Sequence, residues 1–237
     1  PSVILNELRR LRPDRIVVAG GPTVISNSVL TTLRTVSPVV SRVHGPDRYA
    51  TSRALALDAY GQSGASSVYL ATGAGFADAL AAGPAAASVD APVLLLNGSL
   101  ATIDDETLAA IRALGARTVV IAGSAAVVSA GIESSLRALG FTVQRYAGAD
   151  RYATASAIAA AHFPDAASGF VATGSGFADA LSGGAAAGAL GAPLFTSKTS
   201  CVPRSAHTAL RNQNPDAVVL LGGLGVLLPT VAGFYRC

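Results

Sequence analysis

An arginine that stands at the same place in two copies of a motif is the first candidate for chemistry. Gly-x-Asp-Arg-Tyr-Ala-Thr occupies residues 45–51 and returns at residues 148–154. A guanidinium group can bind a phosphate or a carboxylate through two parallel N–H donors, so we expect Arg48 and Arg151 to contact a negatively charged ligand. An alternative stays open, in which each arginine pairs with an aspartate of a neighbouring unit, for example Arg48 with Asp78.

A glycine-rich loop is the second repeated motif, with Ala-Thr-Gly-x-Gly-Phe-Ala-Asp-Ala-Leu at residues 71–80 and again at 172–181. Free backbone N–H groups in such a loop can hold an anion together with the helix dipole, so its glycines are candidate ligand contacts (Gly73, Gly75, Gly174 and Gly176). A dinucleotide-binding loop has its third glycine where this motif has Asp78 or Asp179, and a carboxylate there would repel a pyrophosphate. The structural interpretation, in which these aspartates cap the helices that follow, is preferred at this loop.

The residues around the two arginines are expected to shape the site rather than to bind. Asp47 and Asp150 come directly before predicted helices and are expected to cap their N-termini. Structural roles are also assigned to the repeated tyrosines and the loop aspartates (Tyr49, Tyr152, Asp78 and Asp179). Asn97 and Lys198 follow two predicted core strands, where they could touch a ligand at the edge of the sheet.

Catalytic chemistry finds no support in the sequence. The three histidines, His44, His162 and His207, do not recur between the repeats, and no Gly-x-Ser-x-Gly motif marks a nucleophilic serine. No cluster of His, Cys and Asp has the spacing of a zinc site. We therefore expect no catalytic residue, no metal and no cofactor, although two carboxylates could still meet in space.

Short apolar strands alternate with helices in both copies of the repeat. In the first copy we expect the alternating elements at residues 68–71, 76–87, 91–96, 102–114, 118–122, 129–139 and 141–146. Strands that are apolar throughout are typical of a parallel sheet covered by helices on both faces. The pattern predicts an α/β fold of tandem, doubly wound parallel-sheet modules, Rossmann- or Toprim-like, packed against each other. Ligands of such sheets bind where strands end and helices begin, which is where both motifs fall.

A third repeated segment sets the unit boundaries. Similar strand-and-glycine sequences occur at residues 15–21, 118–124 and 217–223. The chain is therefore expected to hold the C-terminal half of a preceding unit and two further units, at residues 1–44, 45–147 and 148–237. This organisation predicts that the parent protein extends further at its N-terminus. Duplicated sites favour multivalent binding, in which several weak contacts act together.

The composition argues against nucleic-acid and membrane partners. The 237 residues carry a net charge of only +3, Lys198 is the single lysine, and no basic run is interleaved with aromatic residues, so nucleic acid is not expected. Residues 217–235 lack charge over a length that could span a membrane. They contain four glycines and a proline, however, so insertion is not expected.

The chain has two cysteines, Cys201 and Cys237, and neither has a metal-ligand partner at useful spacing. We expect them to form a disulfide that holds the tail against the last unit, which implies an oxidising, extracellular compartment. On the chain-entropy model such a bridge stabilises the fold by about 3–4 kcal/mol. Two free thiols are the alternative.

Taken together, these motifs resemble the cell-wall-binding repeat 2 family of Gram-positive surface proteins. The resemblance rests on both repeated motifs, on Ala-Pro-Val-Leu-Leu-Leu at 91–96 and on Val-Val-Ile-Ala-Gly at 119–123, and it covers nearly the whole chain. It implies parallel α/β modules that come in threes, a location at the cell wall, and binding of an anionic wall polymer. It also implies polymer contacts at the family's Pro-Ile-Leu-Leu position, here Pro92, Val93, Leu94 and Leu95. The second unit departs from that segment with Pro193-Leu194-Phe195-Thr196.

The leading hypothesis is a non-catalytic, secreted module. It would attach a protein to an anionic polysaccharide or teichoic-type polymer of the wall through the repeated arginines and helix N-termini. Packing with a third repeat, in the same chain or in another, is also expected. Two alternatives stay open: an α/β hydrolase or nucleotide-using enzyme with its site between repeats, and a structural self-assembly module.

Overall fold

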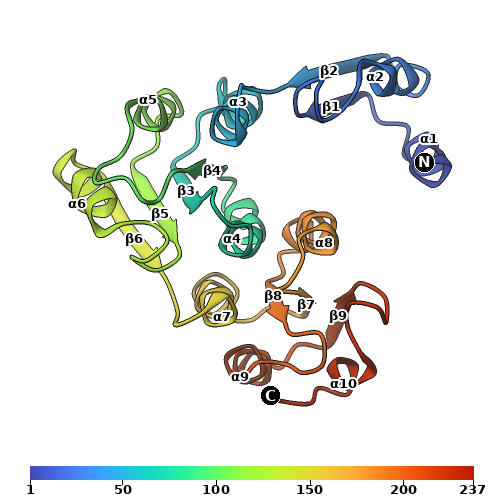
Figure 1. The fold of residues 1–237 in the computed structure, drawn as a ribbon, viewed down its shortest axis with the longest axis vertical. Coiled ribbons are helices and arrows are strands. Elements are labelled where there is room, and N and C mark those ends of the chain that lie inside the picture. The colour runs from blue at the N-terminus through green and yellow to red at the C-terminus, as the bar shows by residue number, and fades with distance from the viewer. The chain divides into compact units, whose positions relative to one another are not determined.

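The computed structural model describes all residues, 1–237, and they form two compact units, residues 1–62 and residues 63–237. Helices and strands alternate along the whole chain (Figure 1). The repeat boundaries expected at residues 45 and 148 remain predictions, and "first repeat" and "second repeat" below denote residues 45–147 and 148–237.

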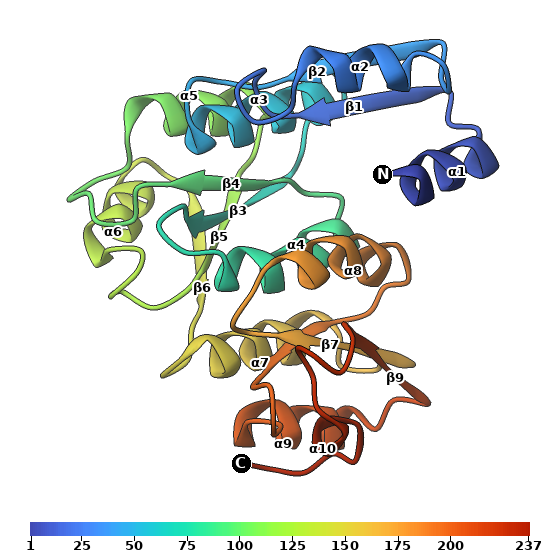
Figure 2. The same ribbon diagram turned by 45° about the vertical axis from the view of Figure 1, so that its right-hand side comes forward.

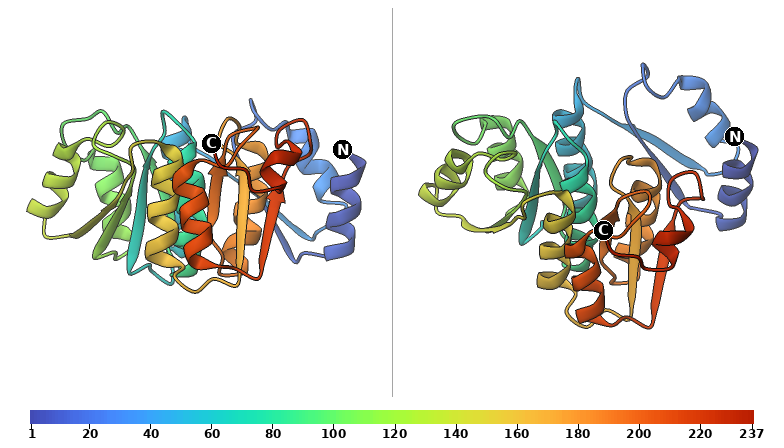
Figure 3. Two further views of the ribbon diagram at one scale, coloured as in Figure 1. Left: turned by 90° about the horizontal axis from the view of Figure 1, so that it is seen from below. Right: turned by 60° about the horizontal axis from the view of Figure 1, so that its bottom comes forward.

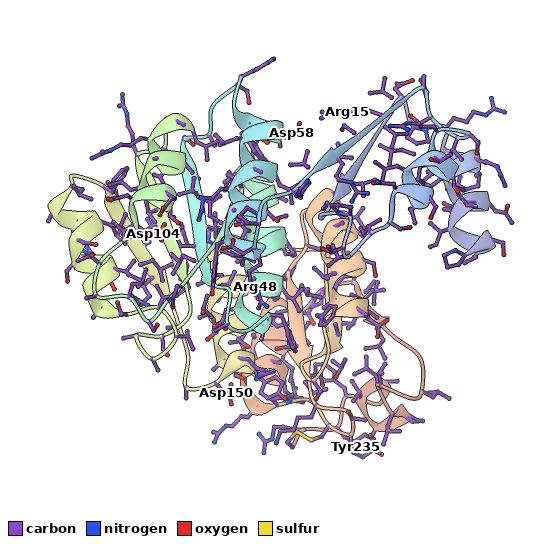
Figure 4. All side chains as sticks on the ribbon, turned by 45° about the horizontal axis from the view of Figure 1, so that its top comes forward. Arg15, Arg48, Asp58, Asp104, Asp150 and Tyr235 are labelled. Atoms are coloured by element: carbon purple, nitrogen blue, oxygen red, sulfur yellow. A yellow bond between two sulfur atoms is a disulfide. The ribbon has the colours of Figure 1, made fainter.

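The N-terminal unit is a two-stranded parallel sheet with three helices. Its elements are α1 (Ser2–Leu11), β1 (Arg15–Ala19), α2 (Asn27–Leu33), β2 (Val39–Val43) and α3 (Arg48–Tyr60). β1 and β2 pair in parallel, and Val18, Leu30 and Leu33 form the buried core of the unit. Arg15 on β1 donates to both carboxylate oxygens of Asp58 on α3 at 2.8 Å, which ties the last helix to the sheet (Figure 4).

The larger unit begins with a four-stranded parallel sheet in the order β4-β3-β5-β6 (Figure 2). Its elements are β3 (Ser67–Thr72), α4 (Ala77–Ser88), β4 (Val93–Leu96), α5 (Asp105–Ala113), β5 (Thr118–Ala122), α6 (Ala130–Ala138) and β6 (Thr142–Tyr146). The chain passes from β3 to β4 on one side and then returns to pair β5 with the other side of β3, so the strand order reverses between β3 and β5. Such a reversal leaves a crevice at the carboxyl ends of the strands.

The second repeat forms a three-stranded parallel sheet with the same order, β8-β7-β9. Its elements are α7 (Arg151–His162), β7 (Ser168–Thr173), α8 (Ala178–Ala189), β8 (Leu194–Ser197), α9 (Arg204–Gln213), β9 (Ala217–Leu221) and α10 (Pro229–Ala232). The predicted fold of tandem parallel α/β modules is therefore confirmed. The predicted strand at 118–122 coincides with β5. The strand expected at 68–71 is one residue shorter than β3 at each end, and the strand expected at 141–146 begins one residue before β6.

Small residues let the helices between the two larger sheets approach closely. α4 packs against both α7 and α8, and alanines supply most of its buried side. A Cβ atom added at Gly188 on α8 would lie 2.8 Å from the Cβ of Ala87 on α4, which is closer than real contacts allow. The alanine and glycine content of the chain therefore serves the packing of one repeat on the next.

A repeated arginine holds the loop that follows a central strand. Arg145 on β6 donates to three carbonyl oxygens after β5 and pairs with Glu133 at 2.7 Å. Arg42 on β2 donates in the same way to two carbonyl oxygens of its own unit. Hydrogen bonds from Arg137 and Arg145 lower the pKa of the Glu133 carboxyl. The sequence did not reveal this role, because most of the partners are backbone atoms.

The second repeat has no fourth strand beside β9. After α10 the chain turns back toward α9 (Figure 3). Arg236 forms a parallel bridge with Val202 in the loop between β8 and α9. The predicted disulfide joins Cys201 to Cys237 at an S–S distance of 2.01 Å. The structure contains no helix with the length and apolar character needed to cross a membrane, and residues 217–235 form β9, a loop and α10.

Candidate functional site

A pocket of about 530 Å³ lies at the carboxyl ends of β3, β4 and β5, where the strand order reverses. The loops that follow these three strands and the start of α7 line it, so we name it the α4–α7 pocket. Both repeated motifs contribute, since the glycine loop comes from the first repeat and the arginine motif from the second. Ligands of this fold are expected where strands end and helices begin, and the pocket lies at that position.

The glycine loop has the same local structure in both repeats. The Thr72 hydroxyl accepts from Ala74 N at 3.2 Å, and the Thr173 hydroxyl accepts from Ser175 N at 3.2 Å. Gly73 N donates to a carbonyl oxygen of the neighbouring strand at 2.9 Å, and Gly174 N does so at 2.7 Å. The expectation that Gly73 and Gly174 offer their N–H groups to an anion is therefore wrong, because the sheet already uses those groups. Gly75 lines the pocket and is exposed; Gly176 is half-buried.

The loop aspartates do not cap the helices as the preferred interpretation held. Phe76 and Phe177 stand at the N-cap positions of α4 and α8, without a side-chain cap, and Asp78 and Asp179 lie in the first turns. The threonine hydroxyl orders the loop instead. Each aspartate points back to the glycine after the neighbouring central strand, since a Cβ atom built on Gly123 would come within 2.8 Å of an Asp78 oxygen.

The turn before α7 explains why the arginine motif has its composition. Asp150 caps the helix by accepting from Ala153 N at 2.8 Å, as predicted. Gly148 N donates to the Thr154 hydroxyl at 3.1 Å. A Cβ atom at Gly148 would lie 2.3 Å from that of Ala153, so only glycine fits.

The same turn precedes α3. Asp47 accepts from Ala50 N at 2.7 Å, which confirms the other predicted cap, and Gly45 N donates to the Thr51 hydroxyl at 3.0 Å. The roles of Thr51 and Thr154 were missed, although both threonines stand in the repeated motif.

Arg151 joins the two repeats at the pocket. The residue is exposed, yet its Nη1 donates to the carbonyl oxygen of Gly174 at 2.6 Å. Its guanidinium carbon lies 5.8 Å from the ring centre of Phe76 in the first repeat, which places a cation over an aromatic face. Tyr152 packs against Gly174, where a Cβ atom would come within 2.7 Å of its ring. The motif thus aims one arginine at its own repeat and at the repeat before it.

The electrostatics of the pocket depend on Asp78 and Arg151. Burial raises the pKa of the half-buried Asp78 carboxyl, and the positive charge of Arg151 partly opposes that rise. Asp150, predicted to be structural, also lines the pocket. The carboxylates sit beside a guanidinium and a helix N-terminus, so the pocket has acceptors and donors close together.

The other residues predicted to contact the ligand do not gather at one site. Leu94 is completely buried (0% exposed) and Pro92 is also buried, so the expected polymer contact at these two residues is wrong. They belong to the core of β4 and its entry, while Val93 and Leu95 are half-buried against that core. Asn97 does line the pocket, as expected from its place after β4. Lys198 is exposed after β8.

Arg48 begins α3 in the N-terminal unit and is exposed (Figure 4). Its suggested pairing with Asp78 would join the two units and stays a prediction. No three or more His, Cys, Asp or Glu side chains gather in an arrangement that could hold a metal ion. The Arg151 guanidinium can bind an anionic group in this pocket, and the hydroxyl and amide groups of Asn97, Ser99 and Ser124 can bind neutral polar groups. The carboxyls of Asp78 and Asp150 oppose an anion there, so Arg151 is the group that would have to hold it.

The model of the family Cell wall binding domain 2 (CWB2) matches residues 42–133 and residues 145–232. The chain belongs to this family. Each CWB2 match contains one arginine motif and one glycine loop, and Arg151 therefore sits where two CWB2 repeats meet. Membership of the family confirms the predicted resemblance and the predicted location at the cell wall or cell surface.

Two relatives come from Bacillus subtilis (strain 168). N-acetylmuramoyl-L-alanine amidase LytC is 31% identical over 193 residues, which are 81% of this chain and 38% of that protein. The amidase enhancer is 28% identical over 218 residues, which are 91% of this chain and 29% of that protein. The chain thus spans well under half the length of either relative.

Two solved structures share the fold of this CWB2 chain. Cwp6 from Clostridium difficile has a TM-score of 0.85 at 24% identity and covers 94% of this chain and 36% of its own. Cwp8 from Clostridium difficile has a TM-score of 0.83 at 24% identity, covering 98% of this chain and 40% of its own.

Proposed function

We propose that the α4–α7 pocket binds an anionic segment of a cell-wall polymer, and that the chain attaches a protein to the wall without catalysing a reaction. Membership of the CWB2 family supports wall binding in general. The anionic polymer, the pocket and the absence of catalysis are the specific parts of the proposal.

The observation that carries the proposal is the placement of Arg151. One Nη donates to Gly174 O, and the remaining guanidinium N–H groups have no partner within the protein. The residue stands at the first position of α7, directly after the capping carboxylate of Asp150. Arg151 adds a cation to the positive end of the helix dipole and the Asp150 carboxylate opposes both, so the start of α7 can still favour a bound anion. An arginine held in one direction is also preorganised to bind a phosphate or carboxylate.

The remaining pocket groups fit the sugar part of such a polymer. Asn97 and Ser99 follow β4, Ser124 follows β5, and all three line the pocket. Neutral amide and hydroxyl groups exchange hydrogen bonds with sugar hydroxyls, whereas Arg151 selects the charged substituent. Because the charge is exposed, salt should weaken the binding.

Cosedimentation with purified walls tests this function. The full chain is mixed with walls of Bacillus subtilis (strain 168), before and after acid extraction of their anionic polymers, and the bound fraction is measured. Arg151→Gln should weaken binding by at least about tenfold, since it removes hydrogen bonds from a charged donor. Arg112→Gln is the matched control, because Arg112 is an exposed arginine in the last turn of α5, away from the pocket. Equal binding of wild type to extracted walls, or of Arg151→Gln to intact walls, would reject the proposal.

Packing with a third repeat is a second part of the proposal, supported by the second repeat's exposed apolar residues. In the first repeat, Leu80 on α4 is 6% exposed because it packs on the second repeat. The matching Leu181 on α8 is 59% exposed, and Phe177 is 53% exposed. Phe177 already meets Phe76 edge to face, at 5.7 Å between ring centres. A further repeat, in the same chain or another, would cover these side chains.

A further inference from the structure

A second groove begins where the α4–α7 pocket ends. It lies between α7 and α9, has a volume of about 680 Å³, and shares Asp150 with the pocket. α7 and α9 lie side by side (Figures 1 and 2), and residues of both helices line the groove. We name it the α7–α9 groove. Since one residue lines both cavities, a chain-like ligand can pass from one to the other around the start of α7.

The start of α9 differs in charge from the matching helix of the first repeat. α5 is capped by an aspartate and carries two more carboxylates in its first turn (Asp104, Asp105 and Glu106). α9 begins instead with Pro203, Arg204 and Ser205, and its first turn has no acidic residue. An arginine is unfavourable at the positive end of a helix, so the exchange weakens the helix by itself. Arg204 lines the groove and has no ion-pair partner, which suits a bound anion.

The groove wall has also gained polar side chains relative to the first repeat. Where α5 and the residue after it have Ala109, Ala113 and Leu114, α9 has Thr208, Asn212 and Gln213. Leu114 is only 1% exposed, so an apolar side chain packs well at this place in the fold.

Gln213 carries a cost that packing alone does not explain. Its amide nitrogen donates to Phe163 O at 2.8 Å and to Ala159 O at 3.2 Å. Its amide oxygen is buried and has no hydrogen-bond partner. A buried acceptor without a partner destabilises a fold, and a leucine would avoid that cost. A polar side chain that lines the groove despite this cost is an independent sign that the groove receives a polar ligand.

The side chains that line the groove indicate the class of ligand. Ser205, Thr208 and Asn212 recur at helical spacing on one side of α9, and none of their side chains has a partner in the structure. Alanines and prolines form the apolar part of the groove, for example Ala153 and Pro164. No aromatic or large aliphatic side chain lines it, although such anchors dominate protein–protein interfaces. Neutral hydroxyl and amide groups beside one guanidinium match a polyhydroxylated ligand that carries an anionic group.

We propose that the α7–α9 groove is a second subsite for the same polymer, in which Thr208 and Asn212 bind sugar hydroxyls and Arg204 binds the next anionic group. The inference rests on the function proposed for the α4–α7 pocket. Asp150, between the two cavities, would face an uncharged sugar, so negative groups alternate with neutral ones along the path. The site exists only in the second repeat, because the first repeat has carboxylates and alanines at the matching positions.

The disulfide supports this subsite. Cys201 and Val202 come directly before Pro203, the first residue of the groove wall on this side. Val202 N donates to Tyr235 O at 2.8 Å, and Cys237 N donates to Val202 O at 3.0 Å. These hydrogen bonds and the disulfide hold the C-terminal tail against the segment directly before α9. Figure 4 shows the disulfide beside Tyr235. Because the start of α9 is already fixed, this side of the groove loses less conformational entropy when a ligand binds.

Fragments of different length test the subsite. Anionic polymer released by acid from walls of Bacillus subtilis (strain 168) is separated into short and long fragments, and the affinity of the full chain for each is measured by calorimetry. The variant Arg204→Gln/Thr208→Ala/Asn212→Ala replaces the contacts, and its two alanines are the residues of the first repeat. We expect about tenfold weaker binding of long fragments and unchanged binding of short ones, which fill the α4–α7 pocket alone.

The control is Arg211→Gln, which removes the same charge from α9 outside the groove and should leave both affinities unchanged. Circular dichroism verifies that each variant is folded. The side-chain amide resonance of Asn212 should shift with long fragments and not with short ones. Unchanged long-fragment affinity in the triple variant, or an equal loss for both lengths, would overturn the subsite. A failure of Arg151→Gln to weaken short-fragment binding would instead count against the function proposed for the pocket.

Discussion

The glycine loop of the first repeat lies against Arg151 of the second, whereas the same loop of the second repeat leaves Phe177 and Leu181 largely exposed. The loops themselves are alike, down to the hydrogen bond of 3.2 Å that the threonine hydroxyl accepts from a backbone N–H. Local sequence therefore produces the loop, and the neighbouring repeat produces the pocket. Each repeat contributes only part of the lining of this pocket.

The two repeats also complete their sheets differently. In the first repeat, β6 pairs with β5, and Arg145 holds the adjoining loop through carbonyl oxygens and Glu133. In the second repeat, a disulfide fastens the tail to the loop after β8, and β9 keeps an open edge. One module relies on a strand and a partly buried ion pair, and the other on a covalent bond.

The largest expected effect comes from removing that covalent bond. The disulfide spans 36 residues, so on the chain-entropy model Cys201→Ser with Cys237→Ser should lower the free energy of unfolding by about 4 kcal/mol. Urea unfolding measures the change. A reducing agent should destabilise the wild type by a similar amount and leave the double-serine variant unaffected. A loss well below about 1 kcal/mol would mean that the tail contributes little to the second repeat.

A matched pair of leucine substitutions tests whether the neighbouring repeat buries the leucine of α4 but not that of α8. Leu80→Ala should cost about 3 kcal/mol, because Leu80 is buried in the core shared by the two repeats. Leu181→Ala should change stability by no more than about 0.5 kcal/mol, because Leu181 is exposed. Thermal unfolding gives both values. If copies of the chain associate through α8, light scattering should show that Leu181→Ala reduces the association. A similar loss of stability in the two variants would contradict the difference in burial between Leu80 and Leu181.

A smaller effect should appear in the pH dependence of wall binding. Burial raises the pKa of Asp78, so its contribution to stability is fully present below the unfolded pKa and lost as the pH rises through the raised value. Protonation also removes a negative charge beside the proposed anion. Between about pH 7 and about pH 4, binding of a phosphate-bearing polymer should strengthen by about two- to fivefold as the pH falls.

Asp78→Asn should remove most of this pH dependence, and Asp179→Asn, the same change in the second repeat, should leave it in place. The cosedimentation assay at several pH values provides the measurement. Glu133 has the opposite sign, since Arg137 and Arg145 lower its pKa and its contribution is lost as the pH falls through the lowered value. Binding that weakens on acidification in both aspartate variants would point to Glu133 or to general unfolding.

The sequence was sufficient wherever structure is local. The caps at Asp47 and Asp150 depend on residues three positions apart, and the strand at 118–122 is a run of apolar side chains ending in glycine. Parallel pairing followed from the alternation of apolar strands with helices, because that pattern allows few topologies. The disulfide followed from the presence of just two cysteines.

The predictions that were wrong or missing concern contacts between segments that are distant in the sequence. Asp78 was taken as a cap because it follows a glycine loop, but Thr72 already orders that loop and the aspartate turns toward Gly123. Leu94 was taken as a ligand contact from the family's motif, yet it is a core residue of β4. The meeting of Arg151 with Phe76 could not be read from spacing, since it depends on how one repeat docks on the other.

If the proposed function holds, the contacts of Arg151 would also make attachment to the wall depend on correct assembly of the two repeats. Its guanidinium donates to a carbonyl of one CWB2 repeat and lies over an aromatic ring of the other, so a polymer held there would bind only the docked pair. By mass action, such a ligand would raise the melting temperature of both repeats together. A molecule in which either repeat is misfolded would not bind the polymer and would be released from the wall. Only correctly folded molecules would then stay attached.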